Sequence, residues 1–206
     1  MWRLDLIYFC DDFCDAANVG NSRQVLHLHA SDMCRFGVDS ARYPNLTAAL
    51  VGQLAGSYSN SDLKDIFDYA NARGIRVVPE FDVPGHSRGF IPVENQGAVF
   101  CNNLSTRTQL YDDPANKTFI LLHSVLQEMS TLFADQVMHI GCDETEVIGP
   151  CTLSSTFSLE RRLLSAVQTQ FHKTPAGWEE ILFNANATTP ETIVYAWYYP
   201  ACRCYD

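Results

Sequence analysis

The chain has 206 residues, of which 47% are apolar, 12% aromatic and 18% charged, a composition typical of a globular domain with a substantial core. We expect a single domain over residues 1–206. The formal net charge of -10 at pH 7 disfavours nucleic acid and anionic membrane surfaces as partners, because both are negatively charged. No apolar run has the length of a transmembrane helix, so membrane insertion is not expected. A neutral ligand such as a sugar fits this composition.

Eight cysteines and four N-x-S/T sequons indicate the secretory pathway. None of the cysteines forms a C-x-x-C pair with the spacing of a zinc site, so disulfides are the better interpretation for some of them. The first twenty residues are too acidic and too interrupted to form a signal peptide, and we expect that peptide to lie outside this chain. The sequons begin at Asn45, Asn103, Asn116 and Asn186.

Hydrophobic periodicity predicts five strands that alternate with helices, which is typical of βαβ units and a parallel sheet. The helices have apolar residues at helical spacing, and the first is expected to stop near Gly74. In chain order, the predicted elements are a strand at Val25–His29, a helix at Ser61–Arg73, a strand at Ile75–Asp82, a helix at Pro114–Phe133, a strand at Val137–Gly141, a helix at Leu159–Phe171, a short strand ending at Trp178 and a strand at Thr192–Trp197.

Acidic, imidazole and indole side chains follow the carboxyl ends of these strands, where parallel sheets bind ligands. Loops are polar in any case, which is the alternative explanation for any single position. Recurrence at the same end of successive strands favours a shared cleft. We interpret His27 as a core histidine, and Glu146 either as a solvated loop acid or as a contributor. The clustered residues are His29, Asp32, Glu80, Asp82, His86, Asp143, Glu144, Trp178, Glu179 and Trp197.

Asp143 and Glu144 are adjacent at the end of a predicted strand, where the turning backbone lets both reach one ligand. Burial or a neighbouring carboxylate raises the pKa of one acid of such a pair, so that one donates a proton while the other stays ionised. This division of roles suits cleavage of a glycosidic bond. Adjacent acids flank one sugar ring poorly, which favours a substrate whose own 2-acetamido oxygen attacks the anomeric carbon.

Two segments of the sequence are distinctive, namely HIGCDE at His139–Glu144 and VLHLHASD at Val25–Asp32. The first resembles the H-x-G-G-D-E signature of glycoside hydrolase family 20, the β-N-acetylhexosaminidases, and the second resembles that family's N-x-x-H-W-H-x-x-D-D segment. Later segments are similar to its third barrel unit and its next two strands. The matching segments are Val25–Asp32, Arg35–Leu46, Tyr58–His86, His139–Glu144, Gly177–Ile181 and Thr192–Trp197.

This resemblance implies a partial (β/α)8 TIM barrel of about five βα units, equivalent to strands two to six, with the first strand upstream of Met1. It implies hydrolysis of terminal β-linked N-acetylhexosamine from an oligosaccharide or glycoconjugate, through an oxazolinium intermediate and without cofactor or metal. It also implies a lysosomal or extracellular location. The implied roles are general acid for Glu144, acetamido orientation for Asp143, support by Asp32 and His86, pocket walls from Trp178 and Trp197, and sugar binding by Arg3.

Three residues depart from the family pattern: Leu28 replaces a tryptophan, Met33 the second aspartate and Cys142 the second glycine. These departures motivate an alternative, namely an inactive homologue that acts as a carbohydrate-binding or interaction domain. By resemblance to the animal lysosomal relatives, Cys101 and Cys151 are expected to form a disulfide between two active-site loops. A homodimer is among the assemblies that the resemblance allows.

Overall fold

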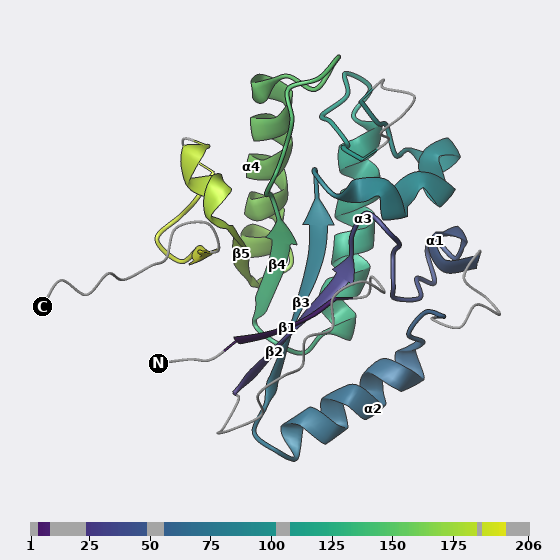
Figure 1. Cartoon of the computed structure of the whole chain (residues 1–206), viewed down its shortest axis with the longest axis vertical. Helices are drawn as coiled ribbons and strands as arrows, with labels where there is room; N and C mark the ends of the chain where they lie inside the picture. Colours follow the sequence, from purple (N-terminus) through teal and green to yellow (C-terminus); the bar gives the residue numbers. More distant parts are fainter. Residues whose placement is uncertain (1–3, 9–23, 49–55, 102–107, 185–186, 197–206) are drawn as a thin grey trace, which may run out of the picture.

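Six parallel strands in chain order form the sheet of this protein (Figure 1). The computed structural model describes residues 4–8, 24–48, 56–101, 108–184 and 187–196, and the strand count refers to these residues. Parallel strands in sequential order are the winding of a (β/α)8 barrel, so the predicted α/β class and partial barrel are confirmed. The strands are β1 (Leu4–Tyr8), β2 (Val25–Ser31), β3 (Arg76–Val83), β4 (Val137–Gly141), β5 (Thr174–Trp178) and β6 (Ile193–Tyr195).

Strand β1 is an addition to the five strands that the sequence pattern predicts. It pairs in parallel with β2, from Leu4 opposite Val25 to Tyr8 opposite His29. This corrects the expectation that the first strand lies upstream of Met1. The segment LDLIY is short and carries an aspartate among its apolar residues, so its own periodicity is weak. Its extended conformation is stabilised by pairing with β2, which local sequence does not reveal.

Three long helices connect the strands, and their boundaries differ from the prediction by a few residues. The largest difference is at α4, which begins at Leu153 rather than Leu159. Thr152 caps this helix: its hydroxyl accepts from the Ser155 backbone N–H at 3.1 Å, and the Ser155 hydroxyl accepts from the Thr152 N–H at 3.0 Å. The helices are α1 (Asn45–Ala48), α2 (Asn60–Asn71), α3 (Lys117–Leu132) and α4 (Leu153–Thr169), with 3-10 helices η1 (Ser87–Gln96) and η2 (Glu179–Phe183). None of the helices in the described part of the chain is long and apolar enough to cross a membrane.

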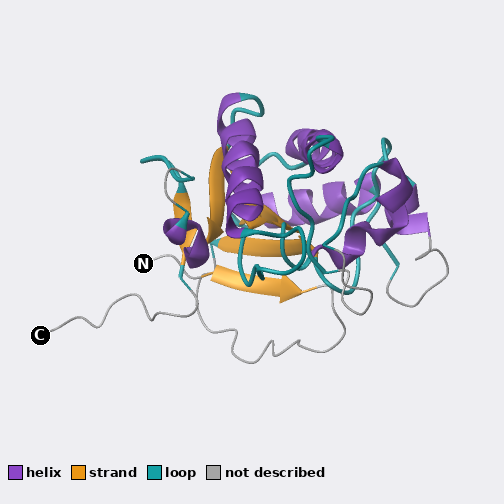
Figure 2. Ribbon diagram, turned by 90° about the horizontal axis from the view of Figure 1, so that it is seen from above, coloured by secondary structure: helices purple, strands orange, loops and turns teal. Residues whose placement is uncertain are grey.

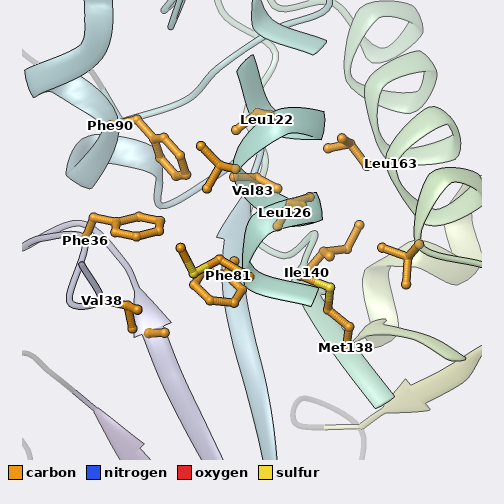
Figure 3. Close-up of a cluster of buried hydrophobic side chains, with 14 of the residues drawn as sticks. Phe36, Val38, Phe81, Val83, Phe90, Leu122, Leu126, Met138, Ile140 and Leu163 are labelled. Carbon is orange, nitrogen blue, oxygen red and sulfur yellow. The ribbon is translucent and has the colours of Figure 1, made fainter. Parts of the chain in front are cut away.

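The main core fills the space between the sheet and the long helices, which gather on one side of the strands in Figure 2. Alternate residues of each strand point toward the helices, so Phe81 on β3 and Ile140 on β4 are fully buried there. Figure 3 shows these side chains meeting leucines from α3 and α4 and Phe36 and Phe90 from the connecting segments. This core holds the strands in a fixed register, which fixes the positions of their carboxyl ends.

The opposite face of the strands changes from apolar to polar along the length of the strands. Near the amino ends it carries a small apolar cluster, made by Val25, Val78, Val137 and Ala176. Two residues further along each strand, the same face carries polar or aromatic side chains, because strand residues alternate. Those side chains are His27, Glu80, His139 and Trp178, and all four are buried.

Candidate active site

A cavity of about 190 Å³ lies at the carboxyl ends of β2, β3, β4 and β5. The arrowheads of β3 and β4 in Figure 1 mark this edge of the sheet. Each of the four strands contributes its last residues or the loop that follows, so one cavity collects side chains that are far apart in the sequence. Its lining consists of His29, Asp32, Asp82, His86, Asp143, Glu144 and Trp178.

The backbone around the cavity is strained in a way that ordinary loops are not. Among the described residues, five non-glycine residues have positive φ, and three of them lie here: His86 at 44°, Cys142 at 73° and Glu144 at 47°. Left-handed conformations cost non-glycine residues about 1 to 2 kcal/mol each and cluster at functional sites. The strain has a geometric result, since the turned backbone after β4 directs both Asp143 and Glu144 into one cavity.

Gly141 and Gly85 permit the close approach of β3 and β4 at this edge. Gly141 has φ of 71°, and a Cβ there would lie 1.8 Å from the Asp82 carboxylate oxygen Oδ1. A Cβ on Gly85 would lie 2.6 Å from the Asp143 carbonyl oxygen. Both distances are far shorter than any real contact, so a side chain at either position would separate the two strand ends.

The two adjacent acids occupy different environments. The Asp143 side chain is 14% exposed, whereas the Glu144 side chain is 55% exposed. Burial raises the pKa of Asp143 to about 6, against the lowering effect of nearby His86. Its Oδ1 is buried and has no hydrogen-bond partner among the described residues, so it is an acceptor available to a ligand.

Asp32 and His86 form a chain of contacts that ends at Glu144. His86 Nδ1 lies 3.3 Å from Asp32 Oδ1, and His86 Nε2 lies 3.1 Å from Glu144 Oε2. The contact with Asp32 is the largest influence that raises the pKa of His86. The Met33 backbone N–H also donates to Asp32 Oδ1. Burial opposes ionisation of Asp32, but its hydrogen bonds with His29 and His86 hold its pKa well below the usual range.

Asp82 is a second buried acid beside Asp143. Its side chain is 2% exposed, and its Oδ1 has no hydrogen-bond partner among the described residues. Burial and the charges of Asp143 and Glu80 raise its pKa well above the usual range. Asp82 therefore carries a proton under conditions where Asp32 is ionised.

Trp178 forms one wall of the cavity. It is the last residue of β5 and is 9% exposed. Its indole Nε1 donates to Glu80 Oε1 at 2.8 Å, which fixes the orientation of the ring. An indole held in this way offers a rigid apolar surface to a ligand.

His27, Glu80 and His139 lie close enough together to share a metal ion. The ligands of a tetrahedral zinc ion are about 3.3 Å apart, given metal-ligand bonds near 2.0 Å. His27 Nε2 lies 2.8 Å from Glu80 Oε2, closer than two ligands of one ion, so these two groups contact each other directly. His139 Nδ1 lies 3.2 Å from Glu80 Oε1, but it accepts a hydrogen bond from the Gly141 N–H, which occupies its lone pair.

Five predicted site residues meet in the cavity: Asp32, His86, Asp143, Glu144 and Trp178. Arg3 and Trp197 lie outside the described residues, so their roles stay predictions.

His29 and Asp82 also line the cavity, as the clustering at the strand ends predicted, although the resemblance implied no role for them. Their signal was present in the sequence, because both stand at or near the ends of predicted strands. Glu146 is exposed and is not part of the lining. Its backbone holds the loop instead, since its N–H donates to Gln109 Oε1 at 2.7 Å.

A disulfide joins Cys101 and Cys151, with their Cα atoms 5.6 Å apart, as the resemblance implied. It connects the segment after η1 to the segment before α4. Cys34 is also disulfide-bonded, whereas Cys142 is a free, buried thiol.

Comparison with known proteins agrees with this geometry. Residues 21–203 match the family model described as glycosyl hydrolase family 20, catalytic domain. The chain is 29% identical to β-hexosaminidase subunit beta of Mus musculus, over 86% of this chain and 37% of that protein. It is 30% identical to β-hexosaminidase A of Caenorhabditis briggsae, over 86% of this chain and 36% of that protein. The chain thus spans little more than a third of the length of these relatives.

Among solved structures, the chitobiase of Flavobacterium johnsoniae superposes with a TM-score of 0.70 at 27% identity. That match covers 86% of this chain and 30% of the chitobiase chain. One assignment accounts for the order of the strands, the acids at their carboxyl ends and the sequence match over most of the chain. The chain belongs to glycosyl hydrolase family 20.

Proposed function

We propose that this protein is a β-N-acetylhexosaminidase, which hydrolyses terminal non-reducing β-linked N-acetylhexosamine residues with retention of configuration. The observation that carries the proposal is the unpartnered Oδ1 of Asp143 in a cavity shared with Glu144 and the Trp178 indole. A buried carboxylate oxygen without a partner suits the N–H of a 2-acetamido group. An indole wall suits the methyl of the same group.

In the first step of the proposed reaction, the acetamido carbonyl oxygen of the sugar attacks the anomeric carbon. The glycosidic carbon-oxygen bond breaks, and Glu144 gives its proton to the leaving oxygen. Asp143 accepts a hydrogen bond from the N–H of the resulting oxazolinium ion and stabilises its positive charge. In the second step, water attacks the anomeric carbon and Glu144 takes up a proton, which restores both the acid and the acetamido group.

The neighbouring residues have supporting roles in this proposal. His86, 3.1 Å from Glu144, holds the acid and is itself held by Asp32 at 3.3 Å. The partner is accordingly an oligosaccharide or glycoconjugate with a terminal β-linked N-acetylhexosamine. A location in the secretory pathway is supported by the Cys101–Cys151 disulfide and the four sequons. The homodimer stays a prediction.

The test compares two variants from the same loop. Glu144→Gln removes the proposed acid, and we expect turnover of p-nitrophenyl N-acetyl-β-glucosaminide to fall by about 10² to 10⁴-fold. Glu146→Gln is the matched control, because Glu146 is exposed and does not line the cavity. Wild-type turnover no greater than that of Glu144→Gln would contradict the proposal. If the sugar still bound, that result would favour the carbohydrate-binding alternative.

Substrate assistance has a separate test. p-Nitrophenyl β-glucoside has a hydroxyl in place of the acetamido group and therefore lacks the proposed nucleophile. We expect no measurable hydrolysis of the glucoside, and we expect inhibition by a thiazoline that mimics the oxazolinium ion. Comparable turnover of both substrates would show that the acetamido group is not the nucleophile.

A further inference from the structure

Glu80 is the centre of a buried polar cluster beneath the cavity, which we define as Glu80, His27, His29, His139 and Trp178. The Glu80 side chain is fully buried. Its Oε2 lies 2.8 Å from His27 Nε2 and 2.7 Å from His29 Nδ1. Its Oε1 accepts from Trp178 Nε1 at 2.8 Å and lies 3.2 Å from His139 Nδ1. Three neighbouring strands thus contribute partners to this one carboxylate.

His29 connects this cluster to the cavity. Its Nδ1 faces Glu80, and its Nε2 lies 2.8 Å from Asp32 Oδ2. A carboxylate oxygen next to each ring nitrogen leaves no place for a nitrogen lone pair, so the doubly protonated ring fits best. Burial lowers the pKa of His29, but the contacts with Asp32 and Glu80 outweigh it and raise the pKa to about 10. His29 is therefore a fixed cation between two acids.

Asp32 connects His29 to the groups proposed to react. With Oδ2 held by His29, its Oδ1 is presented to His86 at 3.3 Å, and His86 reaches Glu144 at 3.1 Å. A carboxylate on a short loop has several rotamers, and His29 on Oδ2 together with the Met33 N–H on Oδ1 selects the one that His86 needs. The interactions run from Glu80 through His29, Asp32 and His86 to Glu144 without a gap larger than 3.3 Å.

We infer that Glu80 is a positioning residue for the proposed glycosidase reaction: through His29 it orients Asp32 and hence His86 and Glu144, and through Trp178 it orients the cavity wall. Only the effect of Glu80 on catalysis rests on the proposed function. The positioning itself is a property of the folded chain and is measurable without turnover.

His27 and His29 provide a matched pair for the test. Both lie on β2, are buried and contact Glu80 Oε2, but only His29 also contacts Asp32. The readout is the pKa of His86, measured by NMR titration of its ring. Within the described residues, the titratable groups that face His86 are Asp32 from the end of β2, Asp82 from β3, and Asp143 and Glu144 from the end of β4.

We expect His29→Gln and Glu80→Gln to lower the pKa of His86 by about one unit, because a mobile Asp32 loses its contact with the ring. His27→Gln should leave that pKa unchanged. In His29→Gln, loss of the cation would by itself raise the pKa of His86, so the two explanations have opposite signs. In Glu80→Gln, loss of the anion would by itself lower that pKa, so His29→Gln is the deciding variant. An unchanged or raised pKa of His86 in folded His29→Gln would overturn the inference.

A second measurement uses the wild-type chain, so a folding defect in a variant cannot affect it. Ring nitrogen shifts should show His29 doubly protonated at pH 8, and a singly protonated ring there would overturn the inference. In kinetics, His29→Gln and Glu80→Gln should lower kcat about tenfold, with His27→Gln within about twofold of wild type. Equal kcat losses in the two histidine variants would also overturn the inference. Absence of wild-type turnover would refute the proposed function alone, since the His86 titration would still test the role of Glu80.

Discussion

Glu160 on α4 offers a direct measurement of the free energy of burying an acid in this fold. Its side chain is 2% exposed, and Asn184 Nδ2 donates to its Oε2 at 2.7 Å. Burial raises its pKa from 4.5 to about 7, against the lowering effects of Asn184 and Arg161, while Glu180 adds a further raising effect. The folded state therefore binds more protons than the unfolded state between these two pH values. Stability must fall as pH rises from about 4.5 to about 7 and then level off.

The perturbation is Glu160→Gln, which keeps the shape and an oxygen acceptor for Asn184 but cannot ionise. At about 1.36 kcal/mol per pH unit, ionised Glu160 destabilises the folded chain by about 3 kcal/mol at pH 8.5 and by less than about 1 kcal/mol at pH 5. We expect the variant to be more stable than wild type at pH 8.5, with the difference shrinking by about 2 to 3 kcal/mol at pH 5. Urea unfolding at both pH values measures this difference. A difference in unfolding free energy that is the same at both pH values would refute the reasoning.

Two further predictions concern the backbone at the cavity. Gly141→Ala should lower the free energy of unfolding by at least about 3 kcal/mol, because the added Cβ would collide with Asp82. Gly74 has a similar φ of 67° but open space around it, so Gly74→Ala should lower the free energy of unfolding by only about 1 kcal/mol. Equal losses in thermal unfolding would contradict the collision. Replacing Cys101 and Cys151 by serine removes a disulfide between residues 50 positions apart and should lower the free energy of unfolding by about 4 kcal/mol. A denaturant midpoint unchanged from wild type would exclude this contribution.

The parts of the fold that the sequence predicts are those with strong local periodicity. The strands from Val25, Val137 and Thr192 onward are recognisable because their apolar residues form short runs between loops. The sequence also placed acidic, imidazole and indole side chains at the carboxyl ends of the predicted strands. Five of them line one cavity: Asp32, His86, Asp143, Glu144 and Trp178.

Other features depend on contacts between distant residues and leave no local pattern. β1 exists through its pairing with β2. The left-handed backbone of Glu144 and Cys142 follows from how β3 and β4 meet, not from residue types that favour positive φ. His29 looks in the sequence like any histidine in a strand, and only the fold shows that a carboxylate lies beside each of its ring nitrogens.

The sequential order of the strands has a consequence for how this protein is made. Every strand of the described sheet is hydrogen-bonded only to its predecessor or successor in the chain. Domains form from the amino end as synthesis proceeds, and the preceding strand is made before each new strand, so the sheet can grow one strand at a time on the ribosome. The acids on β2 to β4 would come together first. The Trp178 indole, which forms one wall of the cavity, arrives with β5 and therefore joins the cavity after these acids.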